Sequence, residues 1–70
     1  MLIRFEKEHK YVFDLNMFKK NSFKEVQDDL GWAELINGRL VNIESEDSGF
    51  VYSKAGFLYY VRPKWCRKVE

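Results

Sequence analysis

Aromatic and cationic side chains are interleaved in the stretch GFLYYVRPKWCRK, residues 56–68. Small β-rich domains use such residues to stack nucleic-acid bases and to neutralise phosphates. The same residue types dominate protein interfaces when they cluster in a desolvated centre. The candidate contact residues for a nucleic acid or another partner are Lys54, Tyr60, Arg62, Lys64, Trp65, Arg67 and Lys68.

Strand geometry limits how many of these aromatic rings can face solvent. Alternate residues of a strand point to opposite sides, so Phe57, Tyr59 and Val61 form one row while Tyr60 belongs to the other. One of the two rows must supply the core. Trp65 then either covers one end of that core or anchors a protein contact, and both alternatives stay open.

Negative charge gathers in the middle of the chain. Residues 1–24 carry six cations and three anions (+3), residues 25–47 one cation and seven anions (−6), and residues 48–70 five cations and one anion (+4), for a net charge of +1. A fold that keeps these blocks apart has a dipolar surface that orients a charged partner, whereas an ordinary mixed surface is the alternative. The predicted acidic partner-binding face consists of Glu25, Asp28, Asp29, Glu44, Glu46 and Asp47.

The sequence contains little that suggests catalysis or metal binding. His9 and Cys66 are the only residues of their kinds, and no pattern brings them together as base and nucleophile. A single cysteine cannot form an internal disulfide, and Cys66 and His9 together cannot complete a four-ligand zinc site. The acidic run ESEDSG lacks the spacing of a calcium loop. We therefore expect a non-enzymatic protein with no catalytic residues, no metal and no cofactor.

Length and hydropathy bound the remaining possibilities. Seventy residues correspond to a single globular domain, residues 1–70, and a chain of this size buries only about 60% of its unfolded surface. The aromatic content of 17% helps to compensate for the missing disulfide. No apolar run approaches the roughly 18 residues of a membrane span, and the charged N-terminus lacks the apolar core of a signal peptide. We expect a cytoplasmic protein that does not contact a membrane.

The N-terminal half is expected to contain a hairpin and one short helix. The β-like runs LIRFE and KYVFD flank the charged loop KEHK. In NSFKEVQDDLG, Ser22 and Glu25 have the spacing of a capping box, and Phe23, Val26 and Leu30 share one helical stripe. The pattern predicts a helix over about residues 22–30. The preceding DLNMFKKN is compatible with either a helix or an ordered connection.

Two further hairpins are expected in the C-terminal half. In WAELINGRLVNIE, Asn37 and Gly38 separate two β-like runs, and both residues tolerate the positive φ of a type I′ turn. The run FVYSKAGFLYYV predicts a second hairpin that turns at residues 54–56. The final RPKWCRKVE is either a short closing strand or an arm, because Pro63 cannot donate a ladder hydrogen bond.

These elements predict an α+β fold that is mostly β, with five to seven short strands and one helix. We expect a strongly bent antiparallel sheet or an SH3-like, partly open barrel, since closing a sheet removes exposed edges. An exposed last strand would allow two copies of the chain to pair edge to edge, so the oligomeric state stays open.

The expected function is a protein-binding module that occludes a site on a larger macromolecule. The composition, rich in Lys, Asn, Phe and Tyr, is similar to that of small proteins of bacteriophages and mobile elements, although no motif identifies a family. This similarity implies an inhibitor of a host or defence protein that handles nucleic acid. The alternative is a small nucleic-acid-binding β-barrel that uses the C-terminal basic and aromatic residues.

Overall fold

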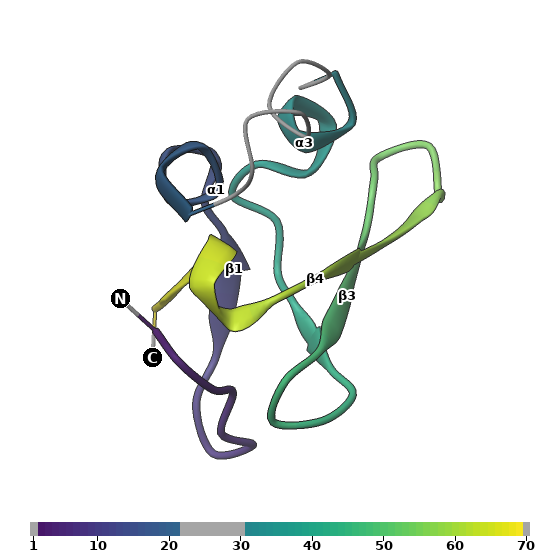
Figure 1. Ribbon diagram of the computed structural model, residues 1–70. Coiled ribbons are helices and arrows are strands. Elements are labelled where there is room, and N and C mark those ends of the chain that lie inside the picture. The colour runs from purple at the N-terminus through teal and green to yellow at the C-terminus, as the bar shows by residue number, and fades with distance from the viewer. Residues whose placement is uncertain (1, 22–30, 70) are drawn as a thin grey trace.

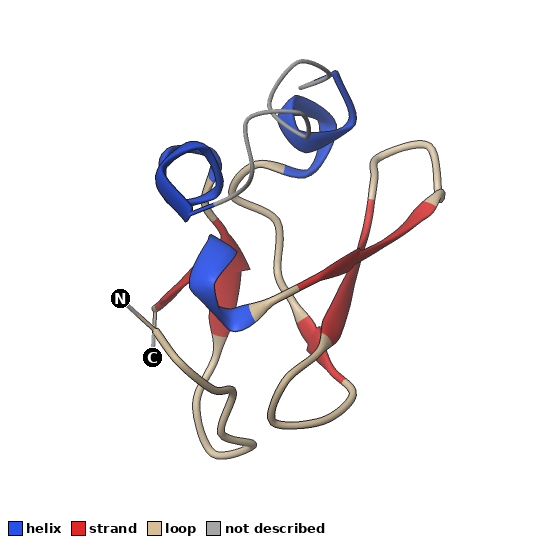
Figure 2. Cartoon of the chain, in the orientation of Figure 1, coloured by secondary structure: helices blue, strands red, loops and turns tan. Residues whose placement is uncertain are grey.

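The computed structural model describes residues 2–21 and 31–69, which form two antiparallel sheets and two α-helices (Figure 1 and Figure 2). Strand β1 pairs with β5, and the second sheet has the order β2-β3-β4. The elements follow one another as β1 (Tyr11–Phe13), α1 (Leu15–Asn21), α3 (Gly31–Ile36), β2 (Asn42–Ile43), β3 (Gly49–Tyr52), β4 (Leu58–Val61), the 3-10 helix η1 (Pro63–Trp65) and β5 (Cys66–Lys68). The expected α+β class and antiparallel pairing are confirmed.

Residues 38–43 make contact with both sheets. Val12 and Leu40 form an isolated antiparallel bridge, and the amide of Val41 donates to the carbonyl of Tyr11 at 2.9 Å. Two residues further on, Asn42 lies opposite Phe50 of β3. The segment therefore runs beside β1 first and beside β3 afterwards, yet the sheets are not closed into a barrel.

Helix α1 forms in the segment that the sequence left undecided. The carboxylate of Asp14 accepts hydrogen bonds from the amides of Asn16 and Met17, at 2.8 and 3.2 Å. This cap satisfies donors that a helix start leaves without intrahelical partners. Phe18 is fully buried one turn later. The helix predicted over residues 22–30 lies outside the described residues.

The hairpin predicted around Asn37 and Gly38 is wrong, because residues 31–36 are helical. Gly38 has φ 79°, and the amide of Arg39 donates to the carbonyl of Ile36 at 3.1 Å. A glycine in the left-handed region ends a helix as readily as it turns a hairpin. The helix is favoured because it buries Ala33 and Ile36 completely.

The N-terminal hairpin is also wrong, although its second run is a strand. Residues 2–6 form no strand; the amide of Phe5 instead donates to the carbonyl of Glu46 at 2.8 Å. The amide of Glu6 donates to the hydroxyl of Tyr11 at 3.0 Å. The first run therefore lies against the β2–β3 loop, which leaves one edge of β1 to β5 and the other to residues 38–41.

The hairpin of β3 and β4 and the closing strand β5 are confirmed. Tyr52 lies opposite Leu58, the amide of Gly56 donates to the carbonyl of Ser53 at 2.9 Å, and Gly56 has φ 92°. Pro63 opens the 3-10 helix between β4 and β5, at a position where its missing amide costs little.

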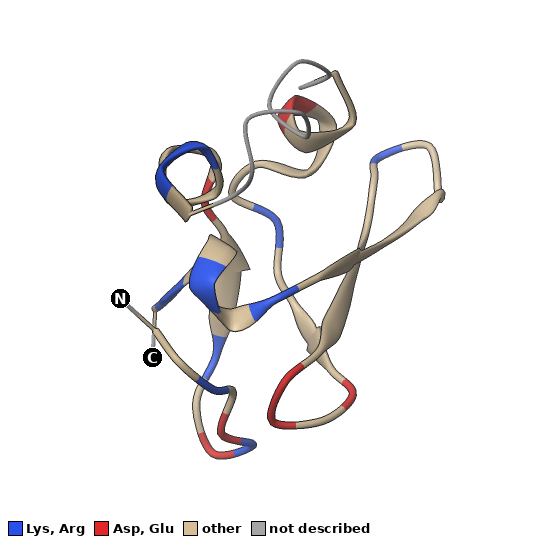
Figure 3. Ribbon diagram, viewed as in Figure 1, with Lys and Arg blue, Asp and Glu red and all other residues tan. Residues whose placement is uncertain are grey.

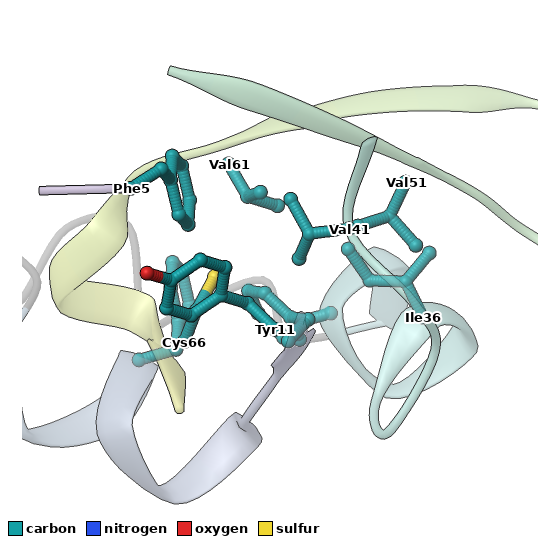
Figure 4. Close-up of a cluster of buried hydrophobic side chains, with 10 residues drawn as sticks. Phe5, Tyr11, Ile36, Val41, Val51, Val61 and Cys66 are labelled. Atoms are coloured by element: carbon teal, nitrogen blue, oxygen red, sulfur yellow. The ribbon is translucent and has the colours of Figure 1, made fainter. Parts of the chain in front are cut away.

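The core lies between the sheets and the helices, where side chains from all of them meet (Figure 4). Gly49 allows a close approach between neighbouring segments, since a Cβ there would stand 2.7 Å from Cγ1 of Val41 and 2.8 Å from the carbonyl oxygen of Asn42. None of the helices in the described part of the chain is both long and apolar enough to cross a lipid bilayer.

Candidate functional site

The predicted acidic residues are only partly described. Glu44, Glu46 and Asp47 lie exposed in the β2–β3 loop, which is closed by the amide of Ser45 donating to the carbonyl of Ser48 at 2.9 Å. The β2–β3 loop lies beside the loop that precedes β1, and both loops carry acidic residues (Figure 3). The other three predicted residues, Glu25, Asp28 and Asp29, lie outside the described residues.

The loop before β1 therefore adds two acidic residues that the sequence did not suggest, Glu6 and Glu8. His9 lies beside them, with its Nε2 3.5 Å from a carboxylate oxygen of Glu6. One ligand atom from each of the three residues falls within 4.8 Å of the others. The loop is largely solvated, and exposed acidic groups often lie this close without a metal, so the proximity does not by itself indicate a metal site.

Cations from three separate elements gather on another side of the molecule (Figure 3). The side-chain amide of Asn21, at the end of α1, donates to the carbonyl of Lys64 in η1 at 3.2 Å. This contact brings the basic end of α1 to the predicted C-terminal cations. We call the result the basic surface; it consists of Lys19, Lys20, Arg62, Lys64, Arg67 and Lys68.

Arg67 belongs to the basic surface but is paired within the protein, and Lys54, another predicted contact residue, lies outside this surface. Nε of Arg67 lies 3.2 Å from a carboxylate oxygen of Asp14, so its charge is partly neutralised within the protein. Lys54 lies in the β3–β4 turn and belongs to none of the elements that form the basic surface. The seven predicted residues therefore do not form one continuous patch.

Trp65 is half-buried and belongs to an aromatic cluster. Its ring meets Phe18 edge to face, with centroids 4.9 Å apart, and lies 6.4 Å from the ring of Trp32. Nε1 of Trp65 is buried and has no hydrogen-bond acceptor among the described residues, so ring packing is what holds the indole. The remaining exposed edges of the cluster form a shallow depression lined by Trp32, Tyr59, Tyr60 and Trp65.

The outward side of the β3–β4 hairpin carries exposed apolar residues. Val51, Tyr59 and Val61 point inward and are buried or half-buried, as alternation requires. The outward positions of a solvated sheet are usually polar, but those of this hairpin are not. They carry Phe50, Tyr52, Leu58 and Tyr60, which we call the aromatic face.

The aromatic face is continuous across the two strands. Phe50 lies opposite Tyr60 in the ladder, and their ring centroids are 6.4 Å apart. Phe50 also meets Tyr52 edge to face at 5.7 Å. Tyr60 is 61% exposed and Tyr52 47%, so a substantial part of this face is available to another molecule.

The thiol of Cys66 is poorly placed for nucleophilic chemistry. The residue is 1% exposed, and its Sγ donates to the carbonyl of Arg62 at 3.3 Å. Burial, with a smaller contribution from the nearby charge of Asp14, raises the pKa of the Cys66 thiol from 9.0 to about 12. A thiol becomes an effective nucleophile as the thiolate, so at neutral pH this group is inert.

The sequence pointed to Tyr60 but missed its neighbours on the same face. Strict alternation in FVYSKAGFLYYV marks Phe50, Tyr52 and Leu58 as one side of a hairpin, and that signal was sufficient to find them. Trp32 was assigned to a strand, so its contact with Trp65 was not expected. Comparison with protein-family models, curated proteins and solved structures finds no match to this chain.

Proposed function

We propose that this protein is a non-enzymatic protein-binding module that contacts its partner through the aromatic face. One observation carries the proposal: the outward side of β3 and β4 presents aromatic and aliphatic side chains where a solvated sheet is usually polar. Contiguous exposed apolar surface on a soluble domain marks an interaction site, and Tyr and Phe supply large contact area at low entropic cost.

The aromatic face is held by a rigid support, which favours recognition over non-specific stickiness. Its strands are joined to each other by a tight turn, and the inward residues Val51 and Val61 are fully packed in the core. The rings of Phe50, Tyr52 and Tyr60 also contact one another. A preorganised surface loses little conformational entropy when a partner binds.

The partner is proposed to be a larger protein whose own site is occluded by the bound module. The acidic β2–β3 loop leads directly into β3 through its last residue, Ser48, whose hydroxyl donates to Glu44 at 3.2 Å. Charge at the rim of an apolar contact guides encounter and specificity more than affinity. A phage or mobile-element inhibitor acting on a host protein is consistent with this arrangement.

We also propose that the fold is SH3-like. Three features support this: β1 has β5 on one side and residue 40 on the other, the same segment continues into β2 beside β3, and a 3-10 turn precedes the last strand. Fold alone does not imply function, so the protein-binding proposal rests on the aromatic face.

A second candidate function, nucleic-acid binding, is favoured by the basic surface. Lys20 of α1 and Lys64 of η1 come from parts of the sequence far apart, and their elements meet at Asn21. Phosphate contacts need such clustered cations. The rings of the aromatic face lie on β3 and β4, whereas the cations lie mainly on α1, η1 and β5. Base stacking and phosphate contact would therefore come from different elements, and we rank this function second.

Affinity capture with and without nuclease separates the two functions. The immobilised chain is incubated with cell lysate, and the retained proteins are compared between the two treatments. The protein-binding proposal predicts a retained protein whose yield is unchanged by nuclease. Loss of every retained protein after nuclease treatment would instead favour the nucleic-acid function.

A further inference from the structure

Strand β4 presents an unpaired edge. It is the last strand of the β2-β3-β4 sheet, so only one of its sides is paired with β3. The amide of Ser53 donates to the carbonyl of the opposite residue, Phe57, and hydrogen-bonded and non-hydrogen-bonded pairs alternate along an antiparallel ladder. The pairs of Tyr52 with Leu58 and of Phe50 with Tyr60 are therefore of the non-hydrogen-bonded kind.

The backbone groups of Leu58 and Tyr60 consequently point away from β3. Within residues 2–21 and 31–69, no backbone hydrogen bond reaches these groups from another segment. Native proteins usually protect such an edge with charged residues, proline or a bulge. Strand β4 has the sequence LYYV and contains no charged residue and no proline, so it remains a template for another strand.

Both sides of this edge can receive side chains. An added strand would alternate its own side chains between the two sides of the sheet. On the outward side they would meet Leu58 and Tyr60, which are 40% and 61% exposed. On the inward side they would enter the shallow depression lined by Trp32, Tyr59, Tyr60 and Trp65.

The charges near the edge indicate what kind of strand fits. Lys54 lies at the turn before β4 and Arg62 directly after it, with Lys64 in η1. Asp47 lines a hollow with Arg62 and Lys64, but no ion pair joins it to either within the described residues. Two antiparallel copies of β4 would bring like charges together at each end. An added strand with acidic residues at its ends would instead be attracted to these cations.

We infer that the edge of β4 binds an extended peptide segment of the partner, with alternating apolar side chains and acidic residues at its ends. This inference rests on the proposed protein-binding function and specifies how the partner is held. Backbone hydrogen bonds to Leu58 and Tyr60 supply the register, and the two apolar surfaces beside the edge select the side chains.

The test uses a displayed library of random peptides of about eight residues, long enough for a typical strand. We expect enriched sequences to alternate apolar residues and to carry Asp or Glu near their ends. In the complex with such a peptide, the amides of Leu58 and Tyr60 should exchange with deuterium at least about tenfold more slowly, since each gains an acceptor.

Leu58→Pro and Leu58→Ser form a matched pair of variants. Both lose the leucine side chain, but only proline lacks the outward backbone amide, and proline is tolerated at the first residue of a strand. The enriched peptides should bind Leu58→Pro about tenfold more weakly than Leu58→Ser, the loss expected for one hydrogen bond. The exchange measurement on the unaltered chain decides the question if the proline variant does not fold.

Four outcomes would overturn the inference, and they differ in what they leave standing. Failure to enrich any peptide, or equal binding to the two Leu58 variants without amide protection, would exclude strand addition. Peptide binding that depends on the Tyr52 and Tyr60 side chains but leaves the amides unprotected would support contact through the aromatic face and refute strand addition at β4. Concentration-dependent protection of the same amides without peptide would identify a second copy of the chain as the occupant.

Discussion

The indole ring of Trp65 packs edge to face against the ring of Phe18, with centroids 4.9 Å apart and an angle of 83° between the planes. This contact joins η1 to α1, two elements from distant parts of the sequence. Trp65 therefore packs against the core and at the same time exposes one edge at the depression beside β4.

Replacing Trp65 should destabilise the fold as a core substitution does. We expect Trp65→Ala to lower the free energy of unfolding by about 3 kcal/mol, and Trp65→Phe by about 1 kcal/mol, because phenylalanine retains part of the ring packing. Urea unfolding followed by circular dichroism measures both values. A loss below about 0.5 kcal/mol for Trp65→Ala, typical of a surface position, would mean that the ring faces solvent.

Gly49 should not tolerate a side chain. Its Cβ would stand 2.7 Å from Val41, so either β2 or β3 must shift. We expect Gly49→Ala to lower the free energy of unfolding by about 2 kcal/mol. The exposed neighbour Asp47 serves as control, since Asp47→Ala should change stability by less than about 0.5 kcal/mol. Similar values for the two variants would contradict the close approach.

The buried thiol of Cys66 should make stability depend on alkaline pH. Burial raises the pKa of the Cys66 thiol from 9.0, its ordinary value, to about 12 in the folded chain. Only the unfolded state loses the proton between these values, so the stabilising contribution is complete below about pH 9 and is lost as pH rises towards 12. Wild type should lose up to about 1.4 kcal/mol per pH unit relative to Cys66→Val in this window.

The comparison with Cys66→Val cancels the titration of lysine and tyrosine residues, which both proteins share. Urea unfolding at about pH 8 and about pH 10.5 gives the difference between wild type and variant. A difference that stays constant across this range would show that the thiol ionises as freely in the folded state. Rapid reaction with a thiol reagent in the native protein would contradict its burial.

The parts of the fold that the sequence predicted correctly are those with a local signal. The hairpin of β3 and β4 has alternation, a compatible turn and Gly56 at a positive φ. The segment around Gly38 has an equally strong signal, but a positive φ serves a helix end as well as a hairpin turn. Burial of Ala33 and Ile36 decides between them, and that depends on contacts the local pattern does not contain.

The candidate site was predictable in its residues and not in its assembly. Tyr60 was expected to contact a partner, and Trp65 either to anchor a contact or to cover the core. Both line the depression beside β4, but Tyr60 is exposed whereas Trp65 packs on Phe18. The basic surface includes Lys20 because α1 meets η1. No pattern along the chain indicates which distant elements will touch.

The nucleic-acid candidate makes a separate prediction about salt. If the basic surface binds single-stranded DNA or RNA, log affinity should fall with log salt concentration, and the slope should shrink in Lys20→Glu and Lys64→Glu. Lys54→Glu is the control, because Lys54 lies in the β3–β4 turn, outside the basic surface. Fluorescence anisotropy with labelled oligonucleotides measures the slope. No binding at about 50 mM salt would remove this function.

The most direct test of the central claim is capture of protein by variants of the aromatic face. Tyr52→Ser and Tyr60→Ser are combined in one chain, and Leu35→Ser is the matched control, since Leu35 is 59% exposed on α3. Each immobilised chain is incubated with nuclease-treated lysate, and the retained partner is quantified by mass spectrometry. We predict that the double variant retains less than about a tenth of the partner, as expected when hot-spot rings are removed, while Leu35→Ser retains all of it. Equal retention by the folded double variant and the wild type would contradict the account.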